Sequence, residues 1–155
     1  MSVVAGLFAW FTIFAALIWP KLKALSPGHR LKTLTAVHLF RYFGTTFLMV
    51  GLVVHKLPVG FADPAAFGDL TALVLAYIAF ITLQRSNAES APGVWVWLFN
   101  VIGVADLLFA FVVGPLLIKN IGDFGVTYLI PTLYVPLLLV AHYYSFKTLT
   151  SPKNG

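Results

Sequence analysis

The stretch from Val94 to Ile118, VWVWLFNVIGVADLLFAFVVGPLLI, decides the fold, because it is long and apolar enough to cross a bilayer as a helix. At a rise of 1.5 Å per residue, Asp106 lies roughly 18 Å from the start of this helix, near the middle of the membrane. An ionisable side chain at that depth costs about 2.5–3.5 kcal/mol on insertion scales. Asp106 therefore needs a partner charge, a bound ion, water or a proton, and it marks where a polar site is to be sought.

The composition extends this conclusion to the whole chain. Of the 155 residues, 60% are apolar and only 10% are charged, whereas soluble domains have about 45–50% and about 25%. The apolar runs are continuous rather than alternating, which favours helices over a transmembrane barrel. The chain has no cysteine, so disulfides, thiolate metal sites and cysteine nucleophiles are excluded. We expect an all-α integral membrane helical bundle.

Five apolar runs predict five transmembrane helices in a single domain that covers residues 1–155. The first is expected to end before Pro20 and the third to begin at Asp63–Pro64, with Asp as N-cap and Pro at the first helical position. The predicted spans cover residues 3–19, 33–54, 64–84, 94–118 and 126–146.

Lysine and arginine are distributed unevenly over the predicted loops, and this predicts the orientation. One side of the membrane would carry Lys21, Lys23, Arg30, Lys32, Arg85, Lys147 and Lys153, and the other only Lys56 and Lys119. Because basic loops stay in the cytoplasm, the N-terminus is predicted outside and the C-terminus inside. Orientation thus explains the net charge of +5, and nucleic acid is not an expected partner.

The second predicted span contains HLFRYFGTT, with His38 and Arg41 three residues apart on one helix face. Arg41 lies roughly 12 Å in from the cytoplasmic end of that span. Its long side chain can reach back to the interface and anchor the helix there. Alternatively Arg41 points inward and pairs with Asp106, since two buried charges of opposite sign make each other tolerable.

Two further polar side chains suggest what the interior holds. Asn100 and Asp106 lie three residues to either side of Gly103, which lets a neighbouring helix approach. They either join helices by hydrogen bonds or line a ligand or ion site. Asp69, roughly 8 Å from the outer end of its span, either forms an acidic mouth with Asp63 or complements the helix dipole.

The last span is interrupted by Pro131 and Pro136, which leave carbonyl groups near Thr132 without their usual donors. Some carriers build binding sites from such carbonyls, and a kink without function is the alternative. His142 in this span lies at nearly the depth of His38. Two histidines at equal depth on two helices are what a bis-histidine b-type haem needs, with Arg41 meeting a propionate.

Four segments together resemble an uncharacterised family of small bacterial multi-span membrane proteins with LPxxFAxPAxxGD-like and FNxxGxxDL-like segments. They are FRYFG at 40–44, LPVGFADPAAFGDL at 57–70, FNVIGVADLL at 99–108 and IPTLYVPLLLVAH at 130–142. The resemblance implies a bacterial cytoplasmic (inner) membrane and no activity. It includes Arg41, Asp69, Asn100, Asp106 and His142.

Three functions follow as hypotheses. The first is a carrier, channel-like or small-ligand-binding protein, with Arg41, Asp69, Asn100, Asp106 and Thr132 binding a small ligand or ion. The second is a haem-binding redox or sensor protein that uses His38 and His142, and the third is a structural or assembly subunit of a membrane complex. No HExxH, phosphate loop or nucleophile elbow favours an enzyme. The lipid bilayer is the expected partner, no other cofactor is expected, and the glycine-rich faces permit homo-oligomers.

Overall fold

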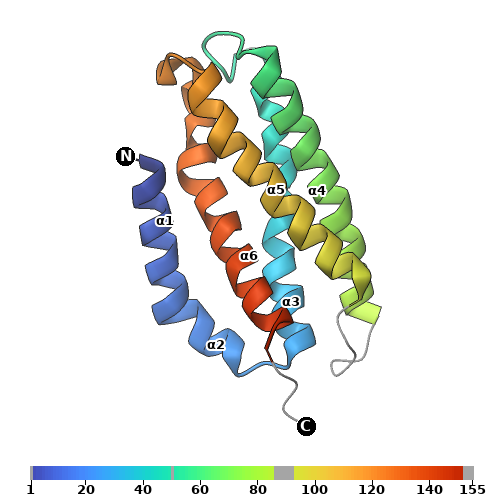
Figure 1. Cartoon of the computed structure of the whole chain (residues 1–155). Coiled ribbons are helices and arrows are strands. Elements are labelled where there is room, and N and C mark those ends of the chain that lie inside the picture. The colour runs from blue at the N-terminus through green and yellow to red at the C-terminus, as the bar shows by residue number, and fades with distance from the viewer. Residues whose placement is uncertain (1, 50, 86–92, 152–155) are drawn as a thin grey trace.

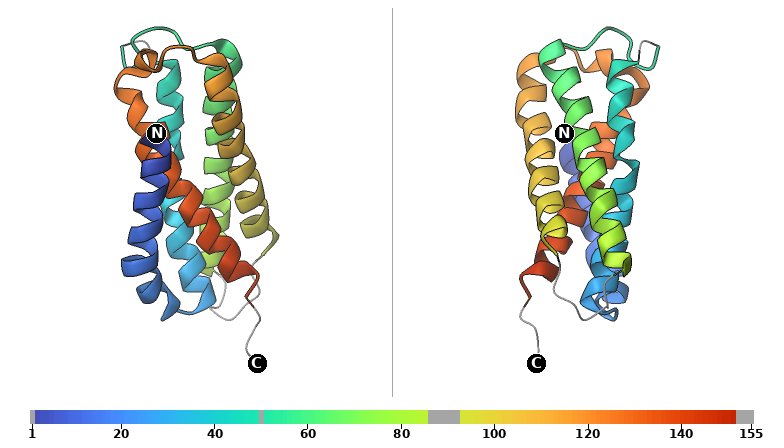
Figure 2. Two further views of the ribbon diagram at one scale, coloured as in Figure 1. Left: turned by 60° about the vertical axis from the view of Figure 1, so that its left-hand side comes forward. Right: turned by 90° about the vertical axis from the view of Figure 1, so that its right-hand side faces the viewer.

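The helices run lengthwise side by side in a bundle (Figure 1), which two further views confirm (Figure 2). The computed structural model describes residues 2–49, 51–85 and 93–151. In chain order the elements are α1 (Ser2–Ile13), the π-helical stretch η1 (Phe14–Ile18), α2 (Trp19–Lys23), α3 (Pro27–Ala36), the 3₁₀ helix η2 (Val37–Leu48), α4 (Val59–Arg85), α5 (Val94–Leu117), the 3₁₀ helix η3 (Ile121–Tyr128), the π-helical stretch η4 (Ile130–Tyr134) and α6 (Val135–Leu149).

Within the described residues, three helices are long and apolar enough to cross a membrane: Ser2–Lys23, α4 and α5. The segments Ile121–Tyr128 and Ile130–Leu149 make a fourth if they form one span, although they meet at a bend of 72°. The predicted second span is helical from Pro27 to Leu48. It does not reach the same apolarity, because it carries Arg30, Lys32 and Arg41.

At one end of the bundle, α1 passes through α2 into α3, and α4 and α6 end (Figure 1); these segments carry most of the basic residues. We call this the basic end; its described members are Lys21, Lys23, Arg30, Lys32, Arg85 and Lys147. Arg30 also holds the turn there, because its guanidinium donates to the carbonyls of Leu22, Lys23 and Leu25. The opposite end carries Lys56 and Lys119, and Lys153 lies outside the described residues.

Two prolines sit inside helices that widen just before them. The first helix continues through Pro20 instead of ending there, and the amide of Trp19 reaches back five residues to the carbonyl of Phe14. The second case is η4, in which the amide of Val135 reaches the carbonyl of Ile130, one residue before Pro136. A proline ring collides with the carbonyl four residues earlier, and a wider turn moves that carbonyl aside. The expected end of the first span at Pro20 is therefore wrong.

The predicted start of the third span at Asp63–Pro64 is also wrong, because α4 begins at Val59 and Pro64 lies inside it. The carbonyl of Pro58 accepts from the amides of Phe61 and Ala62, which starts the helix earlier. A proline this close to the first turn removes one hydrogen bond at most, so the helix tolerates it. Asp63 is consequently a helical residue rather than an N-cap.

The buried face of α4 is made of small side chains and lets η2 and α5 approach closely. Ala62, Ala65, Ala66, Ala72, Ala76 and Ala79 are all at most 4% exposed. Small residues at helix interfaces are how membrane helices pack closely, since lipid gives them no hydrophobic drive to associate. Asp69 lies on this same face, so α4 carries a carboxylate into its tightest contact.

At the edge of the bundle, α1 packs on α6 and η4 through Gly6. A Cβ at Gly6 would meet the carbonyl oxygen of Thr132, one of the carbonyls that Pro136 was predicted to leave without a donor. Trp10 stabilises the same contact, since its Nε1 donates to the carbonyl of Leu133 at 2.9 Å. The unsatisfied backbone of the interrupted helix therefore faces α1.

We expect Gly6→Ala to destabilise the protein, because backbone carbonyl atoms cannot move aside for the added methyl group. Overpacking of this kind costs about 1–3 kcal/mol, more than the helix propensity that alanine gains. Thermal unfolding of the purified protein in detergent measures the change. Gly93→Ala is the control, since a Cβ there meets nothing within 4 Å; an unchanged midpoint for Gly6→Ala would contradict the close approach.

Candidate functional site

The site is set up by η2, whose buried residues recur at every third position. Thr35 at the end of α3 and then His38, Arg41, Gly44 and Phe47 are buried. In an α-helix, residues three apart drift around the axis, whereas in a 3₁₀ helix of 3.0 residues per turn they stand in line. The 3₁₀ geometry therefore presents histidine, arginine and glycine as one straight row toward α4, α5 and α6.

Arg41 lies at the centre of this row and is 0% exposed. Its Nε donates to Oδ1 of Asp69 on α4 at 2.8 Å, and its Nη2 forms an ion pair with Oδ2 of Asp106 on α5. Nη1 reaches the carbonyl of Gly103 at 3.4 Å. We call Arg41, Asp69 and Asp106 the ion-pair cluster. With both carboxylates ionised it carries a net charge of −1.

Three glycines make room for the ion-pair cluster. A Cβ at Gly44 would overlap the carboxylate of Asp69, and a Cβ at Gly68 would overlap that of Asp106. A Cβ at Gly103 would lie 2.7 Å from Nε2 of His142 and 3.3 Å from Nη1 of Arg41. The side chains of the cluster and of His142 therefore occupy space that the side chain of any residue other than glycine would need at these three positions.

A second polar group lies directly beside the ion-pair cluster and consists of His38, Asn100 and His142, all 0% exposed. Nδ1 of His142 lies 2.8 Å from Oδ1 of Asn100, whose Nδ2 donates to the carbonyl of Val96. The two imidazole rings contact each other with centroids 4.1 Å apart. Phe99 packs against both rings.

This group, together with Thr35 and Ser145 three residues along the chain from the two histidines, contains buried polar atoms that have no hydrogen-bond partner among the described residues. They are both ring nitrogens of His38, Nε2 of His142, and the hydroxyl oxygens of Thr35 and Ser145. An unsatisfied buried polar atom costs about 1–3 kcal/mol, so several of them in one place are a costly feature. Such a concentration indicates a functional or hydrated interior rather than simple packing.

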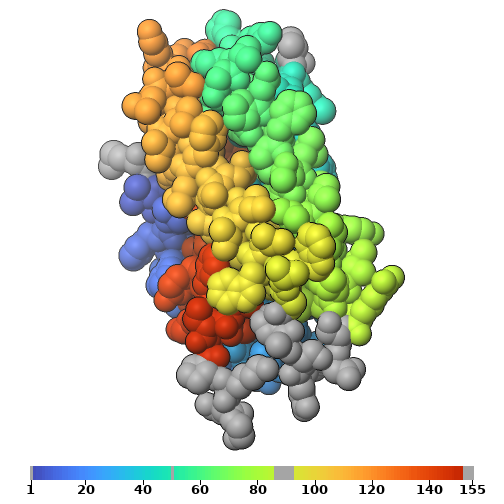
Figure 3. Space-filling view, turned by 45° about the vertical axis from the view of Figure 1, so that its right-hand side comes forward, coloured from blue at the N-terminus to red at the C-terminus, as the bar shows by residue number. Residues whose placement is uncertain are grey.

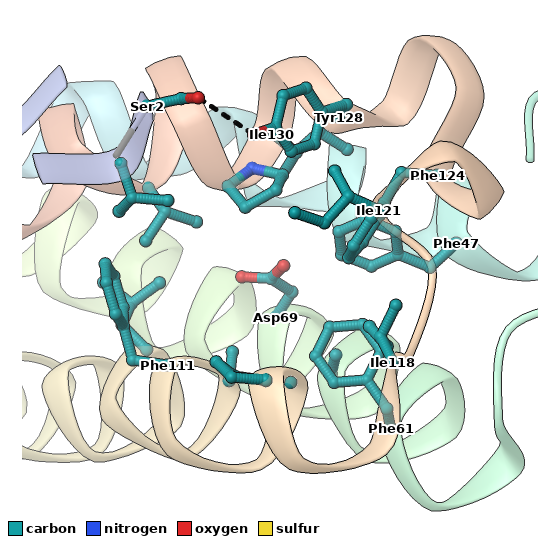
Figure 4. Close-up of a pocket in the computed structure, with 18 of the residues that line it drawn as sticks. Ser2, Phe47, Phe61, Asp69, Phe111, Ile118, Ile121, Phe124, Tyr128 and Ile130 are labelled. Atoms are coloured by element: carbon teal, nitrogen blue, oxygen red, sulfur yellow. Dashed lines mark hydrogen bonds between the residues drawn. The ribbon is translucent and has the colours of Figure 1, made fainter. Parts of the chain in front are cut away.

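On its other side the ion-pair cluster borders a cavity of about 410 Å³. Figure 4 shows the carboxylate of Asp69 pointing into it from α4, with aromatic side chains of several helices around it. Asp106 also lines it, and Lys119 lies at its margin. The aromatic lining consists of Phe47, Phe61, Phe111, Phe124 and Tyr128.

The cavity lies toward the end of the bundle opposite the basic end. There the backbone amide of Val54 donates to the carbonyl of Asp123 at 2.9 Å, which ties the loop after η2 to η3. Gly125, at a φ of +53°, turns the chain inside η3. Figure 3 shows α4 and α5 packed side by side along one face of the bundle, and residues of both helices line the cavity.

The residues predicted for the site are thus divided among different places. Asp69 and Asp106 line the cavity and Arg41 lies behind them, paired with Asp106 as the inward-facing alternative predicted. Asn100 faces His142 instead. Thr132 lies away from the cavity: its hydroxyl donates to the carbonyl of Tyr128 at 2.7 Å and its own carbonyl faces Gly6.

His38 and His142 do lie side by side, at equal depth as predicted, but not in the arrangement of a bis-histidine haem. A haem with both as axial ligands lies between the two rings. Rings with centroids 4.1 Å apart are in van der Waals contact and leave no room for a macrocycle. The residues present therefore do not fit a haem held by this pair.

Several features of the site were not predicted. Asp69 was predicted as a ligand-binding residue, as part of an acidic mouth or as a complement to the helix dipole, and not as the second carboxylate on Arg41, although it directly follows Gly68 and lies on the small face of α4. The roles of Gly44 and Gly68 and the unpartnered hydroxyls of Thr35 and Ser145 were also missed. For Gly44 the sequence did contain a signal, because Gly44 belongs to a series of residues spaced three apart that runs from Thr35 to Phe47.

The chain matches one protein family over residues 1–150, and that family is described as "Domain of unknown function (DUF8737)". No curated protein and no solved structure matches the chain.

Because glycines fit closely against the carboxylates, the same glycine-to-alanine substitution should affect stability differently at two positions on α4. We expect Gly68→Ala to lower the stability strongly, because the new methyl group displaces Asp106 from Arg41. Gly60→Ala is the matched control, since its Cβ meets only the flexible end of the Leu117 side chain at 3.3 Å. Unfolding in mixed micelles by increasing fractions of sodium dodecyl sulfate measures both. Equal stability of the two variants would refute the fit.

The ion-pair cluster predicts that a partial disruption is worse than complete removal. Arg41→Met leaves two carboxylates buried without a cation and is expected to cost about 3–5 kcal/mol. The triple variant Arg41→Met, Asp69→Asn and Asp106→Asn has no buried charge and should recover most of that loss. The same unfolding measurement compares them. A triple variant that is less stable than Arg41→Met would show that the charges themselves hold the bundle together.

Proposed function

We propose a function from the geometry of the site for this chain, which belongs to the family DUF8737: it binds or carries a small organic cation with an apolar body. The ligand enters the cavity of about 410 Å³ and places its cationic head against Asp69 and Asp106. The observation that carries the proposal is the charge of the ion-pair cluster. One guanidinium faces two carboxylates, and both carboxylates are exposed to the cavity.

A bound monocation brings the net charge of the ion-pair cluster to zero, whereas an anion or a neutral ligand leaves it uncompensated. An uncompensated charge in a membrane interior is costly, and a cation at the carboxylates removes that cost. The aromatic lining supports the same choice, since a cation near a ring face gains about 0.5–2 kcal/mol. Lys119 lies at the exposed margin, where water and salt screen its repulsion.

The chain is proposed to cross the bilayer five times, with Pro27–Leu48 as the additional span. The polar side chains His38 and Arg41 of that segment are 0% exposed. The exposed side chains of its η2 part are large and apolar or aromatic, namely Phe40, Tyr42, Phe43 and Leu48. Arg41, the charge in the middle of the segment, thus points into the bundle, and Arg30 and Lys32 lie near its basic end, where a membrane helix tolerates charge. At about 1.5 Å per residue in α3 and about 2.0 Å in η2 it is long enough to span.

The proposed orientation puts the basic end in the cytoplasm and the cavity toward the outside. Basic residues concentrate on the cytoplasmic side of membrane proteins, and the segments that carry them here, α2, α3 and the ends of α4 and α6, lie at one end of the bundle. We place the protein in the cytoplasmic membrane of a bacterium, as the sequence resemblance implies.

Single cysteines test the orientation cleanly, because the chain has none of its own. Lys56→Cys at the cavity end should react with a membrane-impermeant maleimide added to intact cells. Ala24→Cys at the basic end should react only after the membrane is permeabilised. Both positions are exposed. The reverse pattern would invert the proposed topology.

Cation binding is tested with benzyltrimethylammonium as the probe, by isothermal titration calorimetry of the detergent-purified protein. Asp69→Asn keeps the shape of the site and leaves the neutral pair Arg41–Asp106, so we expect a folded protein with at least tenfold weaker binding. Asp63→Asn on the same helix should bind like the unchanged protein, and benzoate should not bind. Equal affinity of Asp69→Asn and Asp63→Asn would contradict a cation site at the ion-pair cluster.

A further inference from the structure

We propose that His38 and His142, with Thr35 and Ser145, carry protons between the ion-pair cluster and the basic end of the bundle. This proposal rests on the buried unpartnered atoms and not on the cavity, so it stands or falls independently of cation binding. The atoms concerned lie on the opposite side of the ion-pair cluster from the cavity.

The path begins where the histidine pair meets the ion-pair cluster. Nε2 of His142 is buried and unpartnered, and it borders the same Cβ position of Gly103 as Nη1 of Arg41. Glycine at position 103 keeps this space free of a side chain. A proton acceptor is therefore placed next to the group that holds both carboxylates.

Asn100 determines which nitrogen of His142 is the acceptor. The carbonyl of Val96 can only accept a hydrogen bond, so the amide nitrogen of Asn100 faces it and Oδ1 faces His142. Oδ1 can only accept in turn, so Nδ1 of His142 carries the proton. Nε2 of the neutral ring then presents a free lone pair toward the ion-pair cluster.

The second histidine extends the path without a competing interaction. His38 is in ring contact with His142, and neither of its nitrogens has a partner among the described residues. Its remaining ring contact is with Phe99, which cannot take a proton. A histidine held only by ring contacts can turn between donor and acceptor, whereas a hydrogen-bonded ring is fixed in one tautomer.

Two hydroxyl groups continue toward the basic end on the same two helices. Thr35 precedes His38 by three residues and Ser145 follows His142 by three, so both lie one helical turn nearer to that end. Both are buried and unpartnered. Other helical threonines of this chain, such as Thr132 and Thr148, donate back to their own helix. Free hydroxyls can donate and accept at once, as a proton path requires.

Each transfer conserves charge and needs no reagent other than the proton. A proton leaves the carboxyl oxygen of Asp106 or Asp69, crosses the space beside Arg41 on a water molecule, and is bound by Nε2 of His142, which yields a carboxylate and an imidazolium. The imidazolium passes a proton to His38, and the hydroxyls of Thr35 and Ser145 relay it onward through water. Chains of Asp, Glu and His inside membranes have this role in pumps and transporters.

Proton flux into proteoliposomes of phosphatidylethanolamine and phosphatidylglycerol tests the path. A potassium gradient with valinomycin imposes the voltage and trapped pyranine reports the internal pH, with and without benzyltrimethylammonium outside. We expect flux in at least one condition, reduced at least tenfold in His142→Asn, which keeps an amide at the Nδ1 position but cannot titrate. His55→Asn, at an exposed histidine, should not change it. No flux in either condition, or an undiminished flux in His142→Asn, would overturn the proposal.

A measurement on the unchanged protein covers the case in which a histidine variant fails to fold. Solid-state NMR of ¹⁵N-histidine-labelled protein in the same lipids resolves the tautomers of the rings. We expect a buried pair whose imidazole protons exchange with deuterated water and that samples more than one protonation state. Two buried rings that stay in single tautomers and do not exchange would contradict a proton path. Cation binding by His142→Asn should persist, which separates this test from that of the proposed function.

Discussion

The burial of one guanidinium determines most of this structure. Arg41 is 0% exposed inside a bundle of largely apolar helices, and a buried charge of that kind persists only when it is paired and hydrogen-bonded. Its three nitrogens reach Asp69 on α4, Asp106 on α5 and the backbone of α5 at Gly103. The guanidinium is planar and its donors are fixed in direction, so these bonds set the distances and the rotation of η2, α4 and α5 together. The glycines and alanines around it are what such close approach requires.

Two carboxylates for one guanidinium is more than pairing demands. A single Arg41–Asp106 pair would be neutral, and a second aspartate adds a buried negative charge that packing does not need. The excess has to be balanced by a cation or a proton, and the structure offers an access for each. The cavity brings Asp69 and Asp106 to an aromatic-lined space, and the unpartnered nitrogens of His142 and His38 lie on the other side. A charge that alternates between cation and proton would couple the two, and the surplus carboxylate is the place where the cation site and the proton path would meet.

Much of the architecture could be predicted because membrane insertion leaves few options. Continuous apolar runs fix the helical class, and the cost of a buried charge singles out Arg41 and Asp106 as partners, which the structure confirms. Asp69 could not be assigned in the same way, because a carboxylate near a helix start is satisfied equally well by the helix dipole. The helix boundaries at Pro20 and Pro64 failed for a related reason. Proline removes one backbone hydrogen bond but does not prevent the helix from continuing. Here a neighbouring turn widened before Pro20, and the helix that contains Pro64 started earlier. Contacts such as that of Asn100 with His142 depend on which helices are neighbours, and this cannot be predicted from the pattern of residues in a single sequence.

The 3₁₀ geometry of η2 is the least expected feature and explains why the two halves of the site adjoin. Long 3₁₀ runs are uncommon because their hydrogen bonds are poorer than those of an α-helix, yet η2 extends from Val37 to Leu48. In an α-helix of 3.6 residues per turn, Thr35 and Phe47, twelve residues apart, would face directions about 120° apart. His38 and Gly44 would then lie about 60° to either side of Arg41 instead of in line with it. A three-residue period keeps all of them on one line, so a single helix face serves the histidine pair, the guanidinium and the carboxylate that fits against Gly44. The less favourable backbone is therefore the condition for a continuous polar line through the bundle.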